Sequence, residues 1–148
     1  MTWDPSQYLR YDIERSQPAR DLIAALGDVD PTEIVDLGCG TGNSTALLEQ
    51  RWPQASLTGI DGSTEMLNQA SQSGVSAAWH AADISTWRPD TPVDLIFSNA
   101  ALHWLDDHTT LFPQLIGTLA ELGALAVQMP YNFSQPSHTL MNDIANEP

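Results

Sequence analysis

Three glycines alternate with other residues directly after a short apolar segment that carries an acid. Gly38, Gly40 and Gly42 follow residues 34–37, and the acid is Asp36. Glycine permits positive φ and lets a ligand lie against bare backbone, and the helix expected next would present free N–H groups at its start. A strand, a glycine loop and a helix in this order are typical of a cradle for a nucleotide-like ligand. The alternative is a tight strand–helix turn that binds nothing.

The spacing of these glycines differs from that of the dinucleotide-binding fingerprint. That fingerprint reads G-x-G-x-x-G, and here the third glycine comes one residue early. The spacing therefore disfavours a second hypothesis, a fragment of an NAD-dependent oxidoreductase.

Two further acids follow apolar segments later in the chain. Asp61 lies about 20 residues beyond the loop, where an acid can accept hydrogen bonds from both ribose hydroxyls. It could instead cap a helix before Gly62, but Ser63 can serve as the cap, which would leave Asp61 free for the ligand. Asp83 is placed to reach the exocyclic amine of an adenine, with a backbone N–H and an apolar wall from Ile84. An ordinary loop aspartate is the alternative for Asp83.

Polar and aromatic residues follow the fourth apolar segment. Ligands of parallel sheets bind at the carboxyl ends of the strands, so Asn99 and His103 are candidate polar contacts and Trp104 a candidate wall. A core or helix-packing role is the alternative for His103 and Trp104.

Helical patterns alternate with the short apolar segments that must position these residues. The segments expected to form strands are 34–37, 56–60, 76–80, 93–99 and 124–129, of which the last is apolar enough to be buried on both faces. Helices are expected from an N-cap at Ser16 to Gly27 and over 45–51, 63–73 and 108–119. The alternation predicts an α/β fold, a three-layer αβα sandwich with a Rossmann-like, mostly parallel sheet. We expect one domain over 1–148, with 1–15 as a lead segment over the site.

Composition excludes several classes of function. The 148 residues carry a net charge of −14, with five arginines and no lysine, which argues against binding to nucleic acid or to anionic membranes. Cys39 is the single cysteine, so we expect neither an internal disulfide nor a multi-cysteine metal site. It has no evident base partner, and the histidines lack metal-ligand spacing. A start without a secretory signal favours the cytoplasm.

The glycine loop followed by Asp61, Asp83 and Asn99 resembles the class I S-adenosylmethionine-dependent methyltransferases. Within that class, further segments are similar to the trans-aconitate 2-methyltransferases, and they include residues 3–9, 51–53 and 127–130. The resemblance implies that S-adenosyl-L-methionine lies over the glycine loop. The cofactor-binding residues it implies are Asp36, Gly38, Cys39, Gly40, Gly42, Asp61, Gly62, Met66, Asp83, Ile84 and Asn99.

The resemblance also implies the reaction, transfer of a methyl group to a carboxylate oxygen of trans-aconitate to give a monomethyl ester. An ionised carboxylate is already a nucleophile, so we expect no catalytic base, and alignment and exclusion of water are enough. A tricarboxylate needs cationic or hydrogen-bonding partners. The candidate substrate-binding residues are Tyr8, Arg10, Tyr11, Arg15, His103 and Trp104, with Trp3 and Asn132 as further candidates. For Arg15 the alternative is an ion pair with Glu14 or Asp12.

Members of this family are longer than this chain. We expect 131–148 to be the start of a truncated C-terminal region and the last strands of the full fold to be absent. The fifth strand would then be an apolar edge able to drive dimerisation. Two alternatives follow: a cofactor-binding but catalytically incomplete fragment, or a methyltransferase for another carboxylate.

Overall fold

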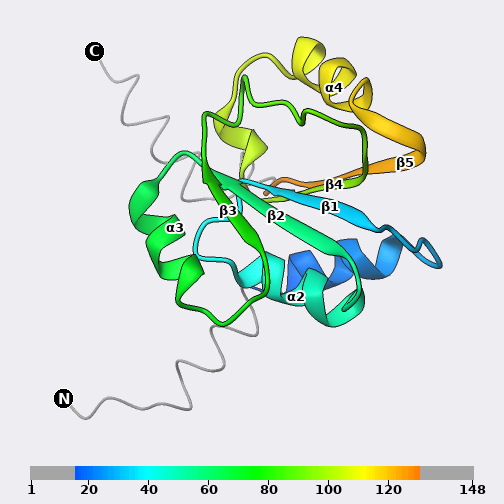
Figure 1. The fold of residues 1–148 in the computed structure, drawn as a ribbon. Helices are drawn as coiled ribbons and strands as arrows, with labels where there is room; N and C mark the ends of the chain where they lie inside the picture. The colour runs from blue at the N-terminus through cyan, green and yellow to red at the C-terminus, as the bar shows by residue number, and fades with distance from the viewer. Residues whose placement is uncertain (1–15, 131–148) are drawn as a thin grey trace, which may run out of the picture.

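Residues 16–130 are described by the computed structural model, and they build a five-stranded sheet with helices on both faces (Figure 1). The predicted lead segment 1–15 and C-terminal region 131–148 lie outside the described residues. After a helix of residues 16–25, the elements in chain order are β1 (Glu33–Leu37), α2 (Asn43–Arg51), β2 (Ser56–Asp61), α3 (Thr64–Ser71), β3 (Ala78–Ala81), β4 (Val93–Asn99), η1 (Leu102–Trp104), α4 (His108–Ile116) and β5 (Leu119–Gln128).

Every strand pair of the described sheet is parallel, and the strand order is β3-β2-β1-β4-β5. The chain runs outward from β1 to β3 and then crosses back to β4 on the other side of β1. The strand order therefore reverses between β1 and β4, and such a switch point opens a crevice at the carboxyl ends of the strands. The predicted α/β class is confirmed, and the sheet is wholly parallel over these residues.

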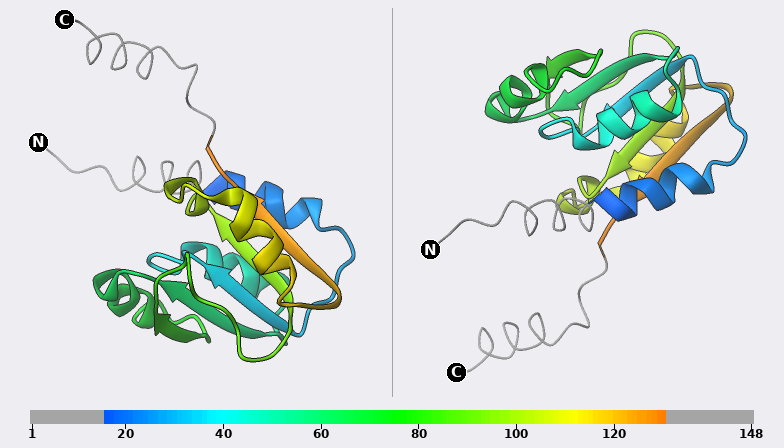
Figure 2. Two further views of the ribbon diagram at one scale, coloured as in Figure 1. Left: turned by 90° about the horizontal axis from the view of Figure 1, so that it is seen from above. Right: turned by 90° about the horizontal axis from the view of Figure 1, so that it is seen from below.

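Side chains alternate between two cores, one on each face of the sheet. Ile34 of β1 joins a cluster with Leu48 of α2 and Ile23 of the first helix. Val35 of β1 faces the opposite cluster, which includes Leu115 of α4. In both figures the first helix and α2 accordingly cover one face, and α4 covers the other (Figures 1 and 2). The same alternation places Asp36 on the face covered by α2.

The last strand differs most from the sequence-based expectation. It begins at Leu119 rather than residue 124, because α4 already ends at Ile116. Only Ala126 of β5 is fully buried; Ala124 packs partly buried on the α2 face and Leu125 and Val127 on the α4 face, so the predicted burial on both faces is partial. Its place at the edge of the described sheet explains this, since an edge strand has a neighbouring strand on one side only. Two smaller corrections are that β3 begins two residues later than expected and that Ser16 is already helical rather than an N-cap.

Candidate ligand site

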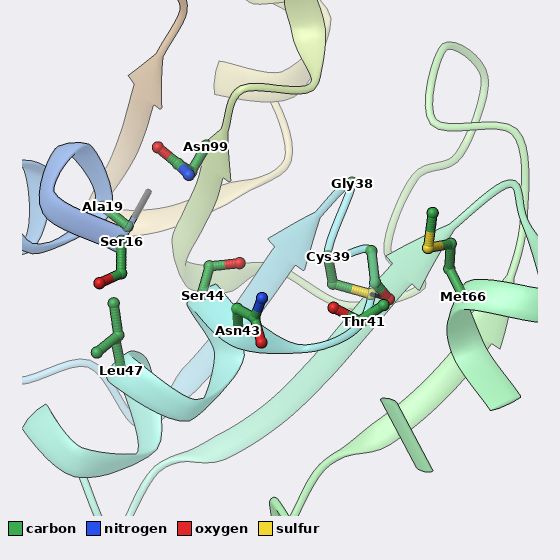
Figure 3. A pocket seen from close by; sticks show the side chains of 11 residues that line it. Ser16, Ala19, Gly38, Cys39, Thr41, Asn43, Ser44, Leu47, Met66 and Asn99 are labelled. Atoms are coloured by element: carbon green, nitrogen blue, oxygen red, sulfur yellow. Dashed lines mark hydrogen bonds between the residues drawn. The ribbon is translucent and has the colours of Figure 1, made fainter. Parts of the chain in front are cut away.

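A pocket of about 310 Å³ lies at the carboxyl ends of β1 and β4 (Figure 3). This volume is within the range of small-molecule sites. The lining residues come from the first helix, the glycine loop, the start of α2, α3 and the end of β4; they are Ser16, Ala19, Gly38, Cys39, Gly40, Thr41, Asn43, Ser44, Leu47, Met66 and Asn99. The pocket thus brings together five of the predicted cofactor residues, Gly38, Cys39, Gly40, Met66 and Asn99.

Two glycines of the loop are required for different reasons. A Cβ on Gly38, at φ +81°, would lie 2.2 Å from the Cβ of Ala101, so this glycine allows the loop to touch the segment after β4. Gly40 has φ +54°, and a Cβ there would meet no atom within 4 Å. Protein packing therefore does not explain Gly40. Its bare backbone faces open space in the pocket, which is the place predicted for a ligand.

Asp36 lies buried behind the pocket wall. Its Oδ2 accepts hydrogen bonds from the Ser44 hydroxyl at 2.7 Å and the Thr45 hydroxyl at 2.6 Å, which joins β1 to the first turn of α2. Its Oδ1 is buried without a hydrogen-bond partner. Burial outweighs the two hydroxyls and raises the pKa of Asp36 to about 6. Asp36 does not line the pocket itself; Ser44, to which it is bonded, does.

Asp61 holds the glycine loop from the end of β2. Its Oδ2 accepts from the Gly40 N–H at 2.9 Å, and its Oδ1 accepts from the Ser63 N–H at 2.8 Å. The Ser63 hydroxyl caps α3 by accepting from the Met66 N–H, as expected. The cap does not leave Asp61 free, because the carboxylate is engaged by both backbone groups. A contact between Asp61 and a ribose would have to use its remaining lone pairs.

The residues predicted to flank an adenine lie outside this pocket. Asp83 is exposed, and its Oδ1 accepts from both the N–H and the hydroxyl of Ser85, which lowers the pKa of Asp83. Ile84 packs against the core on the α4 face. Gly42, which precedes α2, and Gly62, which follows Asp61, also do not line the pocket. Their cofactor roles remain predictions.

The end of β4 contributes one side chain to the pocket, and the segment after it contributes none. Asn99 lines the pocket (Figure 3), and its Oδ1 is buried without a hydrogen-bond partner. His103 Nδ1 is likewise buried without a partner. Trp104 is 80% exposed and does not line the pocket, and its ring lies 4.6 Å from that of His103. The structure therefore gives no support for Trp104 as a pocket wall, and a substrate role for His103 remains a prediction.

The state of Cys39 and the placement of possible metal ligands bear on the chemistry of the site. Burial raises the pKa of the Cys39 thiol to about 12, which leaves no thiolate at neutral pH. Over residues 16–130, no cluster of three His, Cys, Asp or Glu side chains is placed to hold a metal ion. None of the helices in that range has the length and apolar character of a membrane span.

Several lining residues were not predicted. Thr41 lies between two of the glycines, and Asn43, Ser44 and Leu47 belong to the helix that follows them, so the expected start of a helix at a ligand cradle was the signal that pointed to them. No such signal pointed to Ala19, because its position at the pocket depends on how the first helix packs against the sheet. The candidates Tyr8, Arg10, Tyr11 and Arg15, together with Trp3 and Asn132, lie outside the described residues.

Comparisons with known proteins agree with this fold. A family described as "Methyltransferase domain" matches residues 34–123. Trans-aconitate 2-methyltransferase of Klebsiella pneumoniae (strain 342) is 53% identical over 145 residues, 98% of this chain and 57% of that protein. The enzyme of the same name from Azoarcus sp. (strain BH72) is 52% identical, with 96% and 56% covered. The plantazolicin methyltransferase BpumL, solved in complex with SAH, is 26% identical with a TM-score of 0.62, over 79% of this chain and 50% of that one. This chain therefore spans little more than half the length of the relatives it matches.

Proposed function

We propose a function for this chain on the basis of its family, because it belongs to the methyltransferase domains. We propose that its described residues hold S-adenosyl-L-methionine in the pocket between β1 and β4. We further propose that the whole protein transfers the methyl group to a carboxylate oxygen of trans-aconitate, giving a monomethyl ester.

The observation that carries this proposal is the open space over Gly40. Gly40 lines the pocket and a Cβ at this position would meet no protein atom within 4 Å, while φ of +54° keeps the backbone turned in a way that favours glycine. Asn99 lines the same pocket, and its Oδ1 is buried there without a hydrogen-bond partner. An uncovered backbone and an orphaned acceptor fit a ligand that lies flat on the loop and makes polar contacts.

The residues of this chain position the reactants and do not transfer protons. Asp61 fixes the Gly40 N–H, and Asp36 fixes the start of α2 through Ser44, so both sides of the pocket are pre-organised. When bound, S-adenosylmethionine supplies an electrophilic methyl group. Because an ionised carboxylate is already a nucleophile, the protein needs only to align the two partners and to exclude water.

The choice of trans-aconitate is supported by the relatives named trans-aconitate 2-methyltransferase, which are 53% and 52% identical to this chain. A tricarboxylate needs charged or polar partners, and Tyr8, Arg10, Tyr11 and Arg15 are the candidates in the sequence. His103 is a further candidate, since its Nδ1 is buried without a hydrogen-bond partner.

Two measurements on the full chain test these proposals. Calorimetric titration with S-adenosylhomocysteine should show binding at one site per chain. Incubation with radiolabelled S-adenosylmethionine and trans-aconitate should then give a labelled ester. If S-adenosylhomocysteine binds but no labelled ester forms, the chain is a cofactor-binding module and the proposed enzyme activity is rejected. Tighter binding of NADH than of S-adenosylhomocysteine would reject the cofactor assignment.

A further inference from the structure

The indole of Trp79 packs against two glycines, one in the neighbouring strand and one in the glycine loop. Trp79 of β3 pairs with Gly59 of β2, and a Cβ on Gly59 would lie 2.5 Å from both Cε3 and Cζ3 of the indole. A Cβ on Gly42 would lie 3.0 Å from Cη2, at the far end of the same ring. One half-buried side chain therefore occupies the space beside both glycines and reaches from the sheet to the last residue of the loop.

Gly42 thus differs from Gly40, because the space beside Gly42 is filled by protein and the space beside Gly40 is open. Besides Trp79, the Cβ of Ala70 in α3 would lie 3.4 Å from a Cβ on Gly42. Trp79 is not among the described residues that line the pocket. Any effect of Trp79 on a ligand must therefore pass through the loop.

The two halves of the glycine loop are held in different ways. The N–H groups of residues 38–40 all donate to oxygens of β2, at 2.8 to 3.0 Å. In the part of the chain that the structure describes, no hydrogen bond joins Thr41 or Gly42 to the sheet. Instead the Gly42 N–H donates to the Cys39 carbonyl at 2.9 Å, which closes the turn at the pocket. The packing of Trp79 against Gly42 is therefore the contact that supports this half of the loop from the sheet.

We propose that Trp79 is a positioning residue for the cofactor: its indole supports Gly42 and so keeps Gly40 and Thr41, which both line the pocket, at the ligand. This inference rests on the proposed function. A binding site has to be held to within about 0.5 Å by the residues that pack behind it, and a tryptophan supplies a large, rigid surface. A smaller side chain at residue 79 would leave a gap into which the loop can sink. The ligand would then lose contacts although no residue that touches it has changed.

Titration with S-adenosylhomocysteine tests this role in Trp79→Phe, with Trp52→Phe as the matched control. A phenyl ring still covers Gly59 but is too short to replace Cη2 at Gly42, so Trp79→Phe should bind several-fold more weakly than the unaltered full chain. Trp52 is buried at the other end of α2, where its Nε1–H donates to the Val29 carbonyl. Trp52→Phe should therefore lower the free energy of unfolding but leave the affinity unchanged.

The affinity of the folded protein distinguishes positioning from a general loss of stability. Urea unfolding first identifies a temperature at which all variants are fully folded without urea, and affinities are compared only there. Under these conditions a merely structural role predicts that Trp79→Phe binds as tightly as the unaltered chain, a result that would overturn the inference. An equal loss of affinity in Trp52→Phe would overturn it too, since the effect would then not depend on the loop. If the unaltered chain does not bind S-adenosylhomocysteine, the proposed function and this inference are both wrong.

A second variant tests the same contact with Trp79 in place. Gly59→Ala puts a methyl group 2.5 Å from the indole, which must move, so this change should weaken binding in the unaltered chain. In a Trp79→Ala background the indole is gone, and the remaining close neighbour, Cys39 Sγ at 3.0 Å, has to give by only a few tenths of an ångström. Gly59→Ala should therefore weaken binding much less in that background. Equal effects of Gly59→Ala in the two backgrounds would overturn the inference, and this comparison remains decisive where Trp79→Phe does not fold.

Discussion

Gly40 combines a left-handed backbone with an empty space beside it, and these two properties can be tested apart. Gly27 has φ +64°, and a Cβ there would also meet no atom within 4 Å, but Gly27 lies at the end of the first helix, away from the pocket. We expect Gly40→Ala and Gly27→Ala each to lower the free energy of unfolding by about 1–2 kcal/mol. Only Gly40→Ala should weaken S-adenosylhomocysteine binding, by about tenfold or more, because its methyl group occupies ligand space. Urea unfolding and calorimetric titration measure the two effects, and equal affinity in both variants would contradict a ligand over Gly40.

Asp36 makes folding depend on pH in the direction opposite to that of most carboxylates. Its pKa is raised from 3.8 to about 6 by burial. Between these values the folded protein holds a proton that the unfolded chain has released, so the free energy of unfolding falls as pH rises. The loss amounts to at most about 3 kcal/mol. We expect Asp36→Asn to gain stability relative to the unaltered chain between pH 4 and pH 7, measured as urea midpoints across that range.

Asp94 provides the control of opposite sign for this pH experiment. The Thr32 hydroxyl and two backbone N–H groups lower its pKa. Its contribution to stability is therefore present above its ordinary pKa and is lost as the pH falls through the lowered value. Asp94→Asn should accordingly be less stable than the unaltered chain at pH 7, with the difference shrinking in acid. If both variants shift in the same direction with pH, the assignment to Asp36 is wrong.

Strand β5 carries a local irregularity that is not needed for its pairing. Val93 pairs with Leu119 but Leu95 pairs with Ala124, so the four residues 120–123 of β5 stand opposite the single residue Asp94, three more than a regular ladder holds. Within them Leu122 has φ +64° and is 97% exposed. We expect Leu122→Gly to raise the free energy of unfolding by about 1 kcal/mol by relieving the left-handed backbone. Leu122→Ala keeps the backbone strain and removes the exposed side chain, so thermal unfolding of Leu122→Ala should show no such gain.

The elements were largely predictable because their patterns are local. Strand β4 was predicted with the bounds that the structure has, since Val93–Asn99 contains the short apolar run Leu95–Phe97 and follows Pro92. The hydrogen bond from Gly40 to Asp61 was not predicted, because it joins residues that only the pairing of β1 with β2 brings together. The exposure of β5 was missed for a related reason: an apolar run indicates a strand but does not reveal its place in the sheet.

The site depends on the whole topology rather than on one motif. Gly40 follows β1 and Asn99 ends β4, and these strands are neighbours only because the chain crosses back over β1 after β3. The first helix then closes the pocket with Ser16 and Ala19. The glycine motif thus predicts that a ligand is bound, while the strand order determines which distant residues meet it.

The net charge of −14 affects the free energy of unfolding of the whole molecule. Like charges on a compact chain repel one another, and this repulsion lowers the free energy of unfolding. Raising NaCl from about 10 mM to about 150 mM shortens the range of charge interactions from about 30 Å to about 8 Å. We therefore expect the urea midpoint at pH 7 to rise over this interval. At pH about 4 many carboxylates are protonated, so the same salt change should have a much smaller effect there. A midpoint at pH 7 that does not respond to salt would show that the acidic residues are too well separated to repel.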